Sequence, residues 1–317
     1  MTVPSRGDAV PSRGVAGPSA LTDSDAILVV GDVVTDVLAV LRGPLAVGSD
    51  TPAEVRFTGG GSAANTAAWL AAAGAPVTLV ATVGADPAGD ARLAELAAAG
   101  VRLAVRRCPD APTGTVVVLA EPHERSMLND RGANLLLAPS DVDNVLAGAR
   151  HLHLSGYPVL DARSRPAGWH ALAAARALNI TTSVDAASAD PLRRVGGPAF
   201  LSWVRGTNML LANVDEAQAL TGSGAGPAEL ATELLDAAEV AVVKAGSGGA
   251  VWADRSGRVI AVPAEPVTVV DPTGAGDAFA AGLLAAWLAG ADPQSALRAG
   301  VAMGTRAVGA VGARPRA

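Results

Sequence analysis

The most informative stretch of the chain reads Val269-Val270-Asp271-Pro272-Thr273-Gly274-Ala275-Gly276-Asp277-Ala278-Phe279-Ala280-Ala281-Gly282. Two glycines bracket Ala275 directly before an apolar run, so backbone amides can approach a ligand without obstruction at the start of a helix. Amides at a helix N-terminus attract anions. Asp277, in the first turn, either caps this helix or accepts a proton from an attacking hydroxyl beside the bound anion. The stretch therefore predicts an anion site at the start of a helix over residues 275–288.

A second glycine-rich stretch lies earlier in the chain and reads Thr58-Gly59-Gly60-Gly61-Ser62-Ala63-Ala64-Asn65. It leads into an alanine-rich segment, residues 62–73, that ends at Gly74 and is typical of a helix. The glycines alone indicate no more than a tight turn between a strand and a helix. Asn65 lies one turn into this helix, where its amide could both donate to and accept from sugar hydroxyls.

Strands and helices alternate on either side of these two stretches. The first strand is expected over residues 26–30, an apolar and β-branched run that ends in Gly31-Asp32. Such alternation favours an α/β fold, a doubly wound and mostly parallel sheet with helices on both faces. The other strands are expected at 77–81, 151–154, 181–184, 209–211, 240–243, 249–253 and 259–262, and the other helices at 87–99, 163–178, 214–220, 227–235 and 293–308.

Two stretches break this alternation. Residues 37–41 with 54–57, and 115–120 with 125–129, read as strand pairs with polar alternation and no helix between them. They are expected to form either ordinary edge hairpins or a small β-sheet lid, spanning 36–57 and 114–130, over the carboxyl ends of the core strands. Residues 1–22 contain Pro, Gly and Ser without an apolar run and are expected to be a disordered tail, which leaves residues 23–317 as one domain.

The bulk composition excludes several classes of function. The net charge of −6 lacks the basic excess of a nucleic-acid-binding protein, and no uncharged apolar run reaches the roughly 20 residues of a membrane span. Cys108 is the only cysteine, so an intrachain disulfide is impossible and a cytoplasmic location is expected. The G-x-x-x-x-G-K-[ST] pattern of P-loop NTPases does not occur. Lys244 is the only lysine among 24 basic residues, which is a mild hint of function.

The two glycine-rich stretches together resemble the ribokinase-like (PfkB-type) carbohydrate kinase family. That family is marked by an early G-G-x-x-x-N element, here Gly60 to Asn65, and a late D-x-T-G-A-G-D element, here Asp271 to Asp277. The late element is highly specific and the early one moderately so. The resemblance runs from about Ile27 to the end of the chain. It implies a ribokinase-like fold and the transfer of a phosphoryl group from ATP to a hydroxyl.

For the reaction, the resemblance implies that Asp277 is the catalytic base that takes the hydroxyl proton. Backbone amides would hold the oxygens of the transferring phosphoryl group, which agrees with a reaction that depends on positioning and charge stabilisation. These amides belong to Gly274, Ala275 and Gly276. The residues that would line the sugar pocket also suit turns and caps, and they are Asp32, Asp36, Gly60, Gly61 and Asn65.

On the nucleotide side, Asn213 and Glu216 match the family's N-x-x-E element, which implies that Glu216 organises Mg²⁺ through water near the ATP phosphates. Without the resemblance, the same pair reads as a helix N-cap and its capping box. Lys244 and Gly246 lie where relatives line the nucleotide site, often with Thr or Ser at the lysine position, so a phosphate contact is one role open to Lys244. Asp271 would hold a monovalent cation, K⁺, beside the anion site.

The expected function is ATP-dependent phosphorylation of a hydroxyl, a primary one, on a small sugar. The alternatives are a nucleoside kinase and an inactive relative that binds sugar or nucleotide. Three Phe and one Tyr leave few rings to stack a base, although five Trp are present. Ribokinases proper carry a lysine where this chain has Ser62, which argues against ribose itself. Arg131 either reaches the substrate or, as the simpler expectation, is a solvated arginine. A homodimer through the lid is left open.

Overall fold

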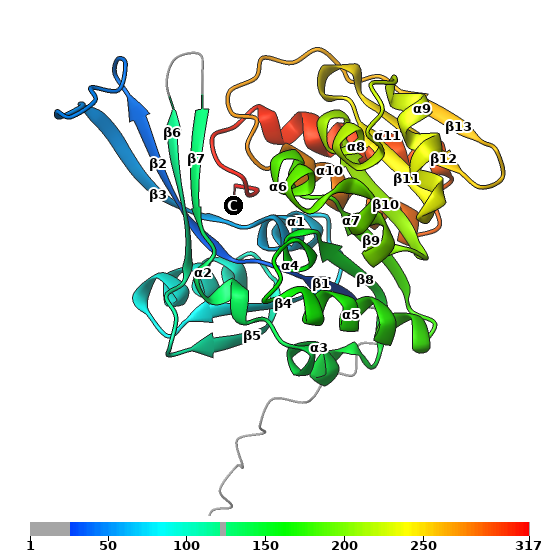
Figure 1. The fold of residues 1–317 in the computed structure, drawn as a ribbon, viewed down its shortest axis with the longest axis horizontal. Coiled ribbons are helices and arrows are strands. Elements are labelled where there is room, and N and C mark those ends of the chain that lie inside the picture. The colour runs from blue at the N-terminus through cyan, green and yellow to red at the C-terminus, as the bar shows by residue number, and fades with distance from the viewer. Residues whose placement is uncertain (1–25, 121–124, 317) are drawn as a thin grey trace, which may run out of the picture.

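The computed structural model describes residues 26–120 and 125–316, so the predicted tail of residues 1–22 lies outside the described residues. Within them, one large sheet and one smaller sheet are formed (Figure 1). The large sheet consists of β1 (Ala26–Val30), β4 (Val77–Gly84), β5 (Arg102–Cys108), β8 (Ala149–Ser155), β9 (Thr181–Asp185), β10 (Thr207–Asn213), β11 (Ala238–Lys244), β12 (Ala250–Asp254) and β13 (Val259–Val262).

The strand order of the large sheet is β13-β12-β11-β10-β9-β8-β1-β4-β5. From β11 to β5 all neighbouring strands are parallel, and β12 and β13 add an antiparallel edge. The sequence of β1, Ala-Ile-Leu-Val-Val, is buried at every position because helices cover both sides of the sheet. The predicted doubly wound α/β fold is confirmed.

Helices cover both faces of the large sheet. One face is covered by α1 (Ser62–Ala72), α2 (Pro87–Ala98), α10 (Ala275–Leu288) and α11 (Pro293–Val308). The other face is covered by α3 (Pro139–Leu146), α4 (Tyr157–Leu160), α5 (Arg165–Ala177), α6 (Ala189–Val195), α7 (Gly197–Val204), α8 (Val214–Thr221) and α9 (Pro227–Glu233). Short 3₁₀ turns span Gly132–Leu136, Leu234–Asp236 and Gly246–Gly248.

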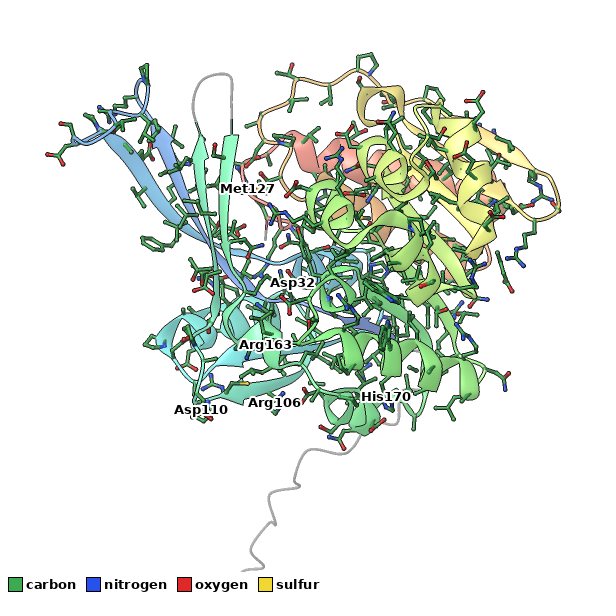
Figure 2. All side chains as sticks on the ribbon, in the orientation of Figure 1. Asp32, Arg106, Asp110, Met127, Arg163 and His170 are labelled. Atoms are coloured by element: carbon green, nitrogen blue, oxygen red, sulfur yellow. The ribbon has the colours of Figure 1, made fainter. Side chains whose placement is uncertain are left out.

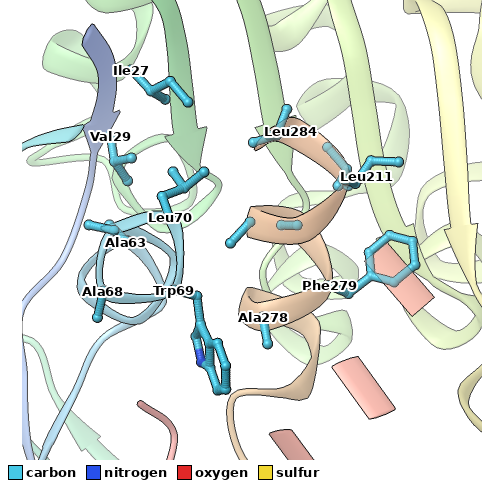
Figure 3. Close-up of a cluster of buried hydrophobic side chains, with 14 of the residues drawn as sticks. Ile27, Val29, Ala63, Ala68, Trp69, Leu70, Leu211, Ala278, Phe279 and Leu284 are labelled. Atoms are coloured by element: carbon cyan, nitrogen blue, oxygen red, sulfur yellow. The ribbon is translucent and has the colours of Figure 1, made fainter. Parts of the chain in front are cut away.

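The core consists of two apolar layers separated by the sheet. Alternate residues of β1 point to opposite sides, so Ile27 and Val29 face the layer of α1 and α10, whereas Leu28 and Val30 face the other layer. Figure 3 shows α1 and α10 side by side, with Leu70 of α1 opposite Leu284 of α10. The two glycine-rich elements lead into these two helices, so the packing of α1 against α10 brings their N-termini close together.

The smaller sheet stands off the core at the upper left of Figure 1. Its strands are β2 (Val34–Leu41), β3 (Ala53–Gly60), β6 (Gly114–Ala120) and β7 (Arg125–Asp130), in the order β3-β2-β6-β7. The strand pairs β2–β3 and β6–β7 are antiparallel, as the polar alternation indicated, and β2 pairs in parallel with β6. Two hairpins therefore join into one sheet, which we call the lid, instead of forming separate edges.

Several elements were not predicted. β5 was missed because its arginines interrupt an apolar pattern at the edge of the sheet, and α6 and α7 were missed because Gly196, Gly197 and two prolines punctuate them. A crossover between the parallel strands β9 and β10 nevertheless requires such helices. In the part of the chain that the structure describes, no helix is long and apolar enough to span a membrane.

Candidate active site

Polar side chains gather at the carboxyl ends of the core strands. Asp32 follows β1, and Ser155, Asp185, Asn213 and Lys244 end β8, β9, β10 and β11. The strand register places Asn213 beside Lys244 and Ser155 beside Asp185. In Figure 2 Asp32 lies at the junction between the lid and the core, and Met127 lies farther out on the lid. Carboxyl ends of parallel strands are the usual place for a ligand in such sheets.

The loop before α10 has the shape of an anion site. Gly274 has the left-handed φ of 78°, and a Cβ there would lie 2.5 Å from the carbonyl oxygen of Ala313, so glycine is required. The buried carboxylate of Asp271 accepts hydrogen bonds from the amides of Thr273 (2.9 Å) and Gly312 (3.0 Å) and so shapes this loop. The Ala275 amide is one of the three amides predicted to bind the anion. In the structure it donates to the Pro272 carbonyl within the turn.

Asp277 is the third residue of α10, and its carboxylate points at α1 rather than at the backbone of its own helix. Ser62 Oγ donates to Oδ1 and Asn65 Nδ2 donates to Oδ2, each over 2.9 Å. The N-cap is Gly274, so Asp277 is not the cap that helix propensity suggested. Burial raises the pKa of Asp277 to about 7, although the hydrogen bonds from Asn65 and Ser62 act in the opposite direction. A carboxylate with this pKa suits a general base near neutral pH.

Arg314, which sequence reasoning did not single out, lies behind Asn65. Its Nε donates to Oδ1 of Asn65 over 3.2 Å, and its Nη2 donates to the Gly60 carbonyl over 2.9 Å. Glu95 of α2 pairs with Nη1 over 3.2 Å. Figure 1 shows the segment after α11 running back to the base of the lid. A residue three positions from the end of the chain therefore contacts the glycine-rich element of the first quarter.

Asp32 is buried, with 2% of its surface exposed, and has polar neighbours. The amide of Ala63 (3.3 Å) and the hydroxyl of Ser155 (3.4 Å) donate to Oδ1, and Arg131 Nη1 lies 3.3 Å from Oδ2. The Arg131 guanidinium also stacks on the Tyr157 ring, 4.4 Å from its centre. The prediction that Arg131 is solvated is wrong, because only 16% of its side chain is exposed.

The remaining predicted sugar-pocket residues lie at the base of the lid. Gly60 lacks a side chain where the Asp36 carboxylate packs against it, and Gly61 has a φ of 99° with its Cα against the Asp32 carbonyl. Burial raises the pKa of Asp36 to about 6, while Arg314 acts to lower it. Asp32, Asp36, Gly60, Gly61 and Asn65 thus lie around one place, within reach of Asp277 through Asn65.

The nucleotide side begins with Asn213 and Glu216, which form the predicted capping box. Asn213 Oδ1 accepts from the Glu216 amide over 2.8 Å, and the Glu216 carboxylate accepts from the Asn213 amide nitrogens over 2.7 Å. Burial raises the pKa of Glu216 to about 7, against the effect of Lys244. Gly246 lies exposed in the short turn after β11, two residues beyond Lys244.

Lys244 is paired with Asp185, a residue that sequence reasoning did not single out. Its Nζ donates to Oδ2 of Asp185 over 2.6 Å, and 12% of the lysine side chain is exposed. Although burial alone lowers the pKa of Lys244, the carboxylates of Asp185 and Glu216 raise it above its usual value. A Cβ at Gly276 would lie 3.4 Å from Nζ, so the ammonium group borders the anion loop. Asp185 could have been found by the strand-end rule that found Asp32.

A sequence profile described as pfkB family carbohydrate kinase matches residues 24–316. The chain belongs to this family. Among curated relatives of this pfkB-family chain, the ATP-dependent ribose-1-phosphate kinase of Halopiger xanaduensis is 34% identical over 293 residues, covering 91% of this chain and 93% of that protein. The bifunctional protein HldE of Pseudomonas entomophila is 30% identical over 267 residues, and the match spans 54% of its length.

Solved structures share the fold of this pfkB-family chain. Adenosine kinase from Sinorhizobium meliloti superposes with a TM-score of 0.83 and 25% identity, covering 92% of this chain and 96% of that one. A putative ribokinase II from E. coli, in complex with ATP and Mg²⁺, shares the fold with a TM-score of 0.78 and 23% identity, covering 92% and 94%. The predicted family, the ribokinase-like fold and an ATP-dependent carbohydrate kinase activity are confirmed.

Proposed function

We propose that the chain transfers the γ-phosphoryl group of ATP to a hydroxyl, a primary one, of a small sugar, with Asp277 as the base. The observation that carries this proposal is the Asp277 carboxylate, held by Ser62 and Asn65 beside the loop of residues 274–276. As the sugar oxygen attacks the phosphorus, its proton passes to Asp277 and ADP leaves. The amides of Gly274 and Gly276 stabilise the charge on the phosphoryl oxygens, whereas the Ala275 amide donates to the Pro272 carbonyl and shapes the loop.

The acceptor pocket is proposed to consist of Asp32, Asp36, Gly60, Gly61 and Asn65. Carboxylates and the Asn amide suit sugar hydroxyls, because ionised carboxylates only accept hydrogen bonds and the amide does both. Burial of Asp32 and Asn65, at 2% and 4% exposed, keeps water from competing for them. These residues lie at the base of the lid, which supports the proposal that the lid covers a bound acceptor.

A sugar that already carries a phosphate is the acceptor to test first. Arg131 lies against Asp32, at the edge of the proposed pocket, where its guanidinium could meet a phosphate group of the acceptor. Arginine forks suit phosphate groups. The Halopiger relative is named for ribose 1-phosphate. A phosphorylated pentose also agrees with the argument against free ribose from Ser62.

The nucleotide is proposed to bind beside Asn213, Glu216, Lys244 and Gly246, with Lys244 in contact with the phosphates. Among the described residues, no cluster of three or more metal-binding side chains occurs. This fits Mg²⁺, which usually arrives with the phosphates and its waters and needs one or two carboxylates; Glu216 and Asp185 could supply these. Bound Mg²⁺ would neutralise phosphate charge. Asp271 is the proposed contact for K⁺, beside the anion loop.

A nucleoside acceptor is the alternative, supported by the likeness to adenosine kinase. One contact argues against a nucleoside. The Arg131 guanidinium already stacks on the Tyr157 ring near Asp32, so that ring is not free to stack on a base. An inactive, ligand-binding relative is less well supported, because Asp277 and its glycines are intact.

The remaining features are also proposals. We take residues 23–317 as one kinase domain with the lid built from 36–57 and 114–130, in a cytoplasmic protein that binds neither nucleic acid nor membranes. The lid exposes Val55, Phe57, Met127 and Leu128, which supports a homodimer through this surface.

The deciding experiment measures ADP formation from MgATP with ribose, ribose 1-phosphate, fructose and adenosine. We expect the highest kcat/KM with the phosphorylated pentose and a product that carries one more phosphate at a former hydroxyl. A preference for adenosine would replace the sugar proposal by the nucleoside one. ATP binding without turnover of any acceptor, measured by calorimetry on the same preparation, would point to the inactive relative.

A further inference from the structure

The segment after α11 crosses the candidate active site. The Gly312 amide donates to Asp271, and the Ala313 carbonyl accepts from Trp69 Nε1 over 2.9 Å. Arg314 then reaches Asn65, Gly60 and Glu95. Within three residues the segment therefore contacts the anion loop, helix α1 and the lid strand β3.

Arg314 decides which way the Asn65 amide faces. An arginine Nε–H can only donate a hydrogen bond, so the Asn65 atom 3.2 Å away must be the oxygen. The amide NH₂ must then face the other way, toward Oδ2 of Asp277 at 2.9 Å. An ionised carboxylate only accepts, so both hydrogen bonds are satisfied in this orientation and neither is satisfied after a flip.

Arg314 is itself held from two other sides. Glu95 pairs with Nη1 and the Gly60 carbonyl accepts from Nη2, so each guanidinium nitrogen has a partner and 14% of the side chain is exposed. Gly59 makes room for this arrangement, because a side chain at that position would occupy the space of the guanidinium and of Glu95. Two neighbouring glycines of β3 thus accommodate Arg314. Gly59 leaves space for the guanidinium because it has no side chain, and the Gly60 carbonyl accepts a hydrogen bond from it.

We infer that Arg314 is a positioning residue for phosphoryl transfer, which orients the Asn65 amide toward the base Asp277 and ties it to the lid strand β3. The inference rests on the proposed role of Asp277. It assigns a function to a residue outside both glycine-rich elements, which the motif pattern of the family does not mark in this chain.

If Arg314 has this role, its removal should lower kcat and leave the affinity for ATP unchanged. Without Arg314 the Asn65 amide can rotate, and Asp277 loses a donor that favours its ionised form. Small misplacements of a catalytic group cost about 10²-fold in rate. The acid limb of kcat/KM should also move to higher pH. The Arg314 charge also attracts the Asp277 carboxylate directly, so its loss acts on the pKa of Asp277 in the same direction, whereas Asp185 and Lys244, the other charged groups that act on Asp277, are unchanged.

The test compares Arg314→Gln with Arg316→Gln, an exposed arginine of the same segment, in the preferred acceptor assay. We expect Arg314→Gln to lose about tenfold to a hundredfold in kcat with an unchanged Kd for ATP, and Arg316→Gln to match the wild type. Arg314→Lys should recover part of the loss. If Arg314→Gln folds poorly, Gly59→Ala serves as the second variant, because a Cβ at that position displaces the guanidinium from Asn65 while the charge of Arg314 is kept, and it should also lower kcat.

A double variant separates this role from a merely structural one. If Arg314 acts through Asn65, then Arg314→Gln with Asn65→Ala should be about as slow as Asn65→Ala alone. Additive losses, or an unchanged kcat and pH profile in Arg314→Gln, would overturn the inference. Asp277→Asn is measured alongside: if it stays active, the proposed base fails and the inference with it, whereas an inactive Asp277→Asn beside a normal Arg314→Gln refutes Arg314 alone.

Discussion

Lys244 Nζ donates a 2.6 Å hydrogen bond to Asp185, and this ion pair joins the ends of two strands that are not neighbours, β9 and β11, across β10. The bond holds the only lysine of the sequence at the edge of the anion loop. The ammonium group is thus held in place by the protein itself, so in the proposed phosphate contact its charge would need no reorganisation during the reaction.

Lys244→Met should lower kcat by about 10²-fold, because it removes a preorganised cation from the developing negative charge. It should also destabilise the fold by about 3 kcal/mol, because Asp185 is left buried without its partner. The double variant Lys244→Met with Asp185→Asn should recover the thermal stability but not kcat. Kinetics and melting curves on all three proteins check this, and a double variant with normal kcat would show that the lysine only balances Asp185.

Asp277→Asn should lower kcat by about 10²- to 10⁴-fold, the usual cost of losing a general base. Asn keeps the shape of the side chain and can still accept from Ser62 or Asn65, so the variant should show no loss of melting temperature and an unchanged Kd for ATP. Ser62→Ala serves as the matched control, because it removes one hydrogen bond and leaves the base. A kcat within a few-fold of the wild type in Asp277→Asn would reject the base.

The pH dependence follows from the pKa of Asp277, which is raised to about 7. Below that pH the carboxyl group is protonated and cannot accept the hydroxyl proton, so kcat/KM should fall as pH drops through 7. The acid limb in wild type should be absent from the residual activity of Asp277→Asn. An acid limb centred near pH 4 would mean that the base keeps its ordinary pKa in the free enzyme.

Stability should respond to pH in the opposite sense. The folded protein holds the Asp277 proton more tightly than the unfolded chain does, so this group stabilises the fold at low pH and loses that effect as pH rises through 7. Asp36 and Glu216 have pKa values of about 6 and 7 and titrate in the same window. The difference between wild type and Asp277→Asn isolates Asp277: the variant should gain in relative melting temperature as pH rises from about 4 to 7.

Potassium should raise the turnover number, because the Asp271 carboxylate ties the anion loop to Gly312 and a cation beside it would add positive charge there. Exchanging K⁺ for tetramethylammonium at constant ionic strength should slow the reaction, and Asp271→Asn should abolish the difference between the two salts. Equal rates of the wild type in both salts would mean that no monovalent cation takes part.

Much of the fold follows from local sequence patterns, for reasons visible in particular elements. All five apolar residues of β1 are buried, and so are the alanines in the first two turns of α1. Both segments therefore show a strong apolar pattern in the sequence. β5 carries Arg102, Arg106 and Arg107 at a sheet edge, and Gly196, Gly197 and two prolines lie in or between α6 and α7, so local propensity there opposes the structure that tertiary packing selects.

The site was predictable only where a residue sits in a motif or at a strand end. Asp277, Asn65 and Glu216 belong to such patterns, and the structure brings the first two into direct contact. Arg314 carries no local signal, since its partners lie more than two hundred residues away, and Arg131 could not be distinguished from a surface arginine before Asp32 and Tyr157 were placed beside it.

The distance along the chain between contacting residues has a consequence for protein synthesis. Ser62 and Asp277 are separated by 215 residues, Trp69 and Ala313 by 244, and Gly60 and Arg314 by 254. The ribosome makes the first partner of each pair long before the second, and domains form as their chain emerges. A nascent chain can thus complete β1, α1 and the lid while the base and Arg314 are still untranslated. The contacts that hold Asn65 against Asp277 therefore cannot all form until Arg314 has left the exit tunnel, well after the elements around Asn65 have been made.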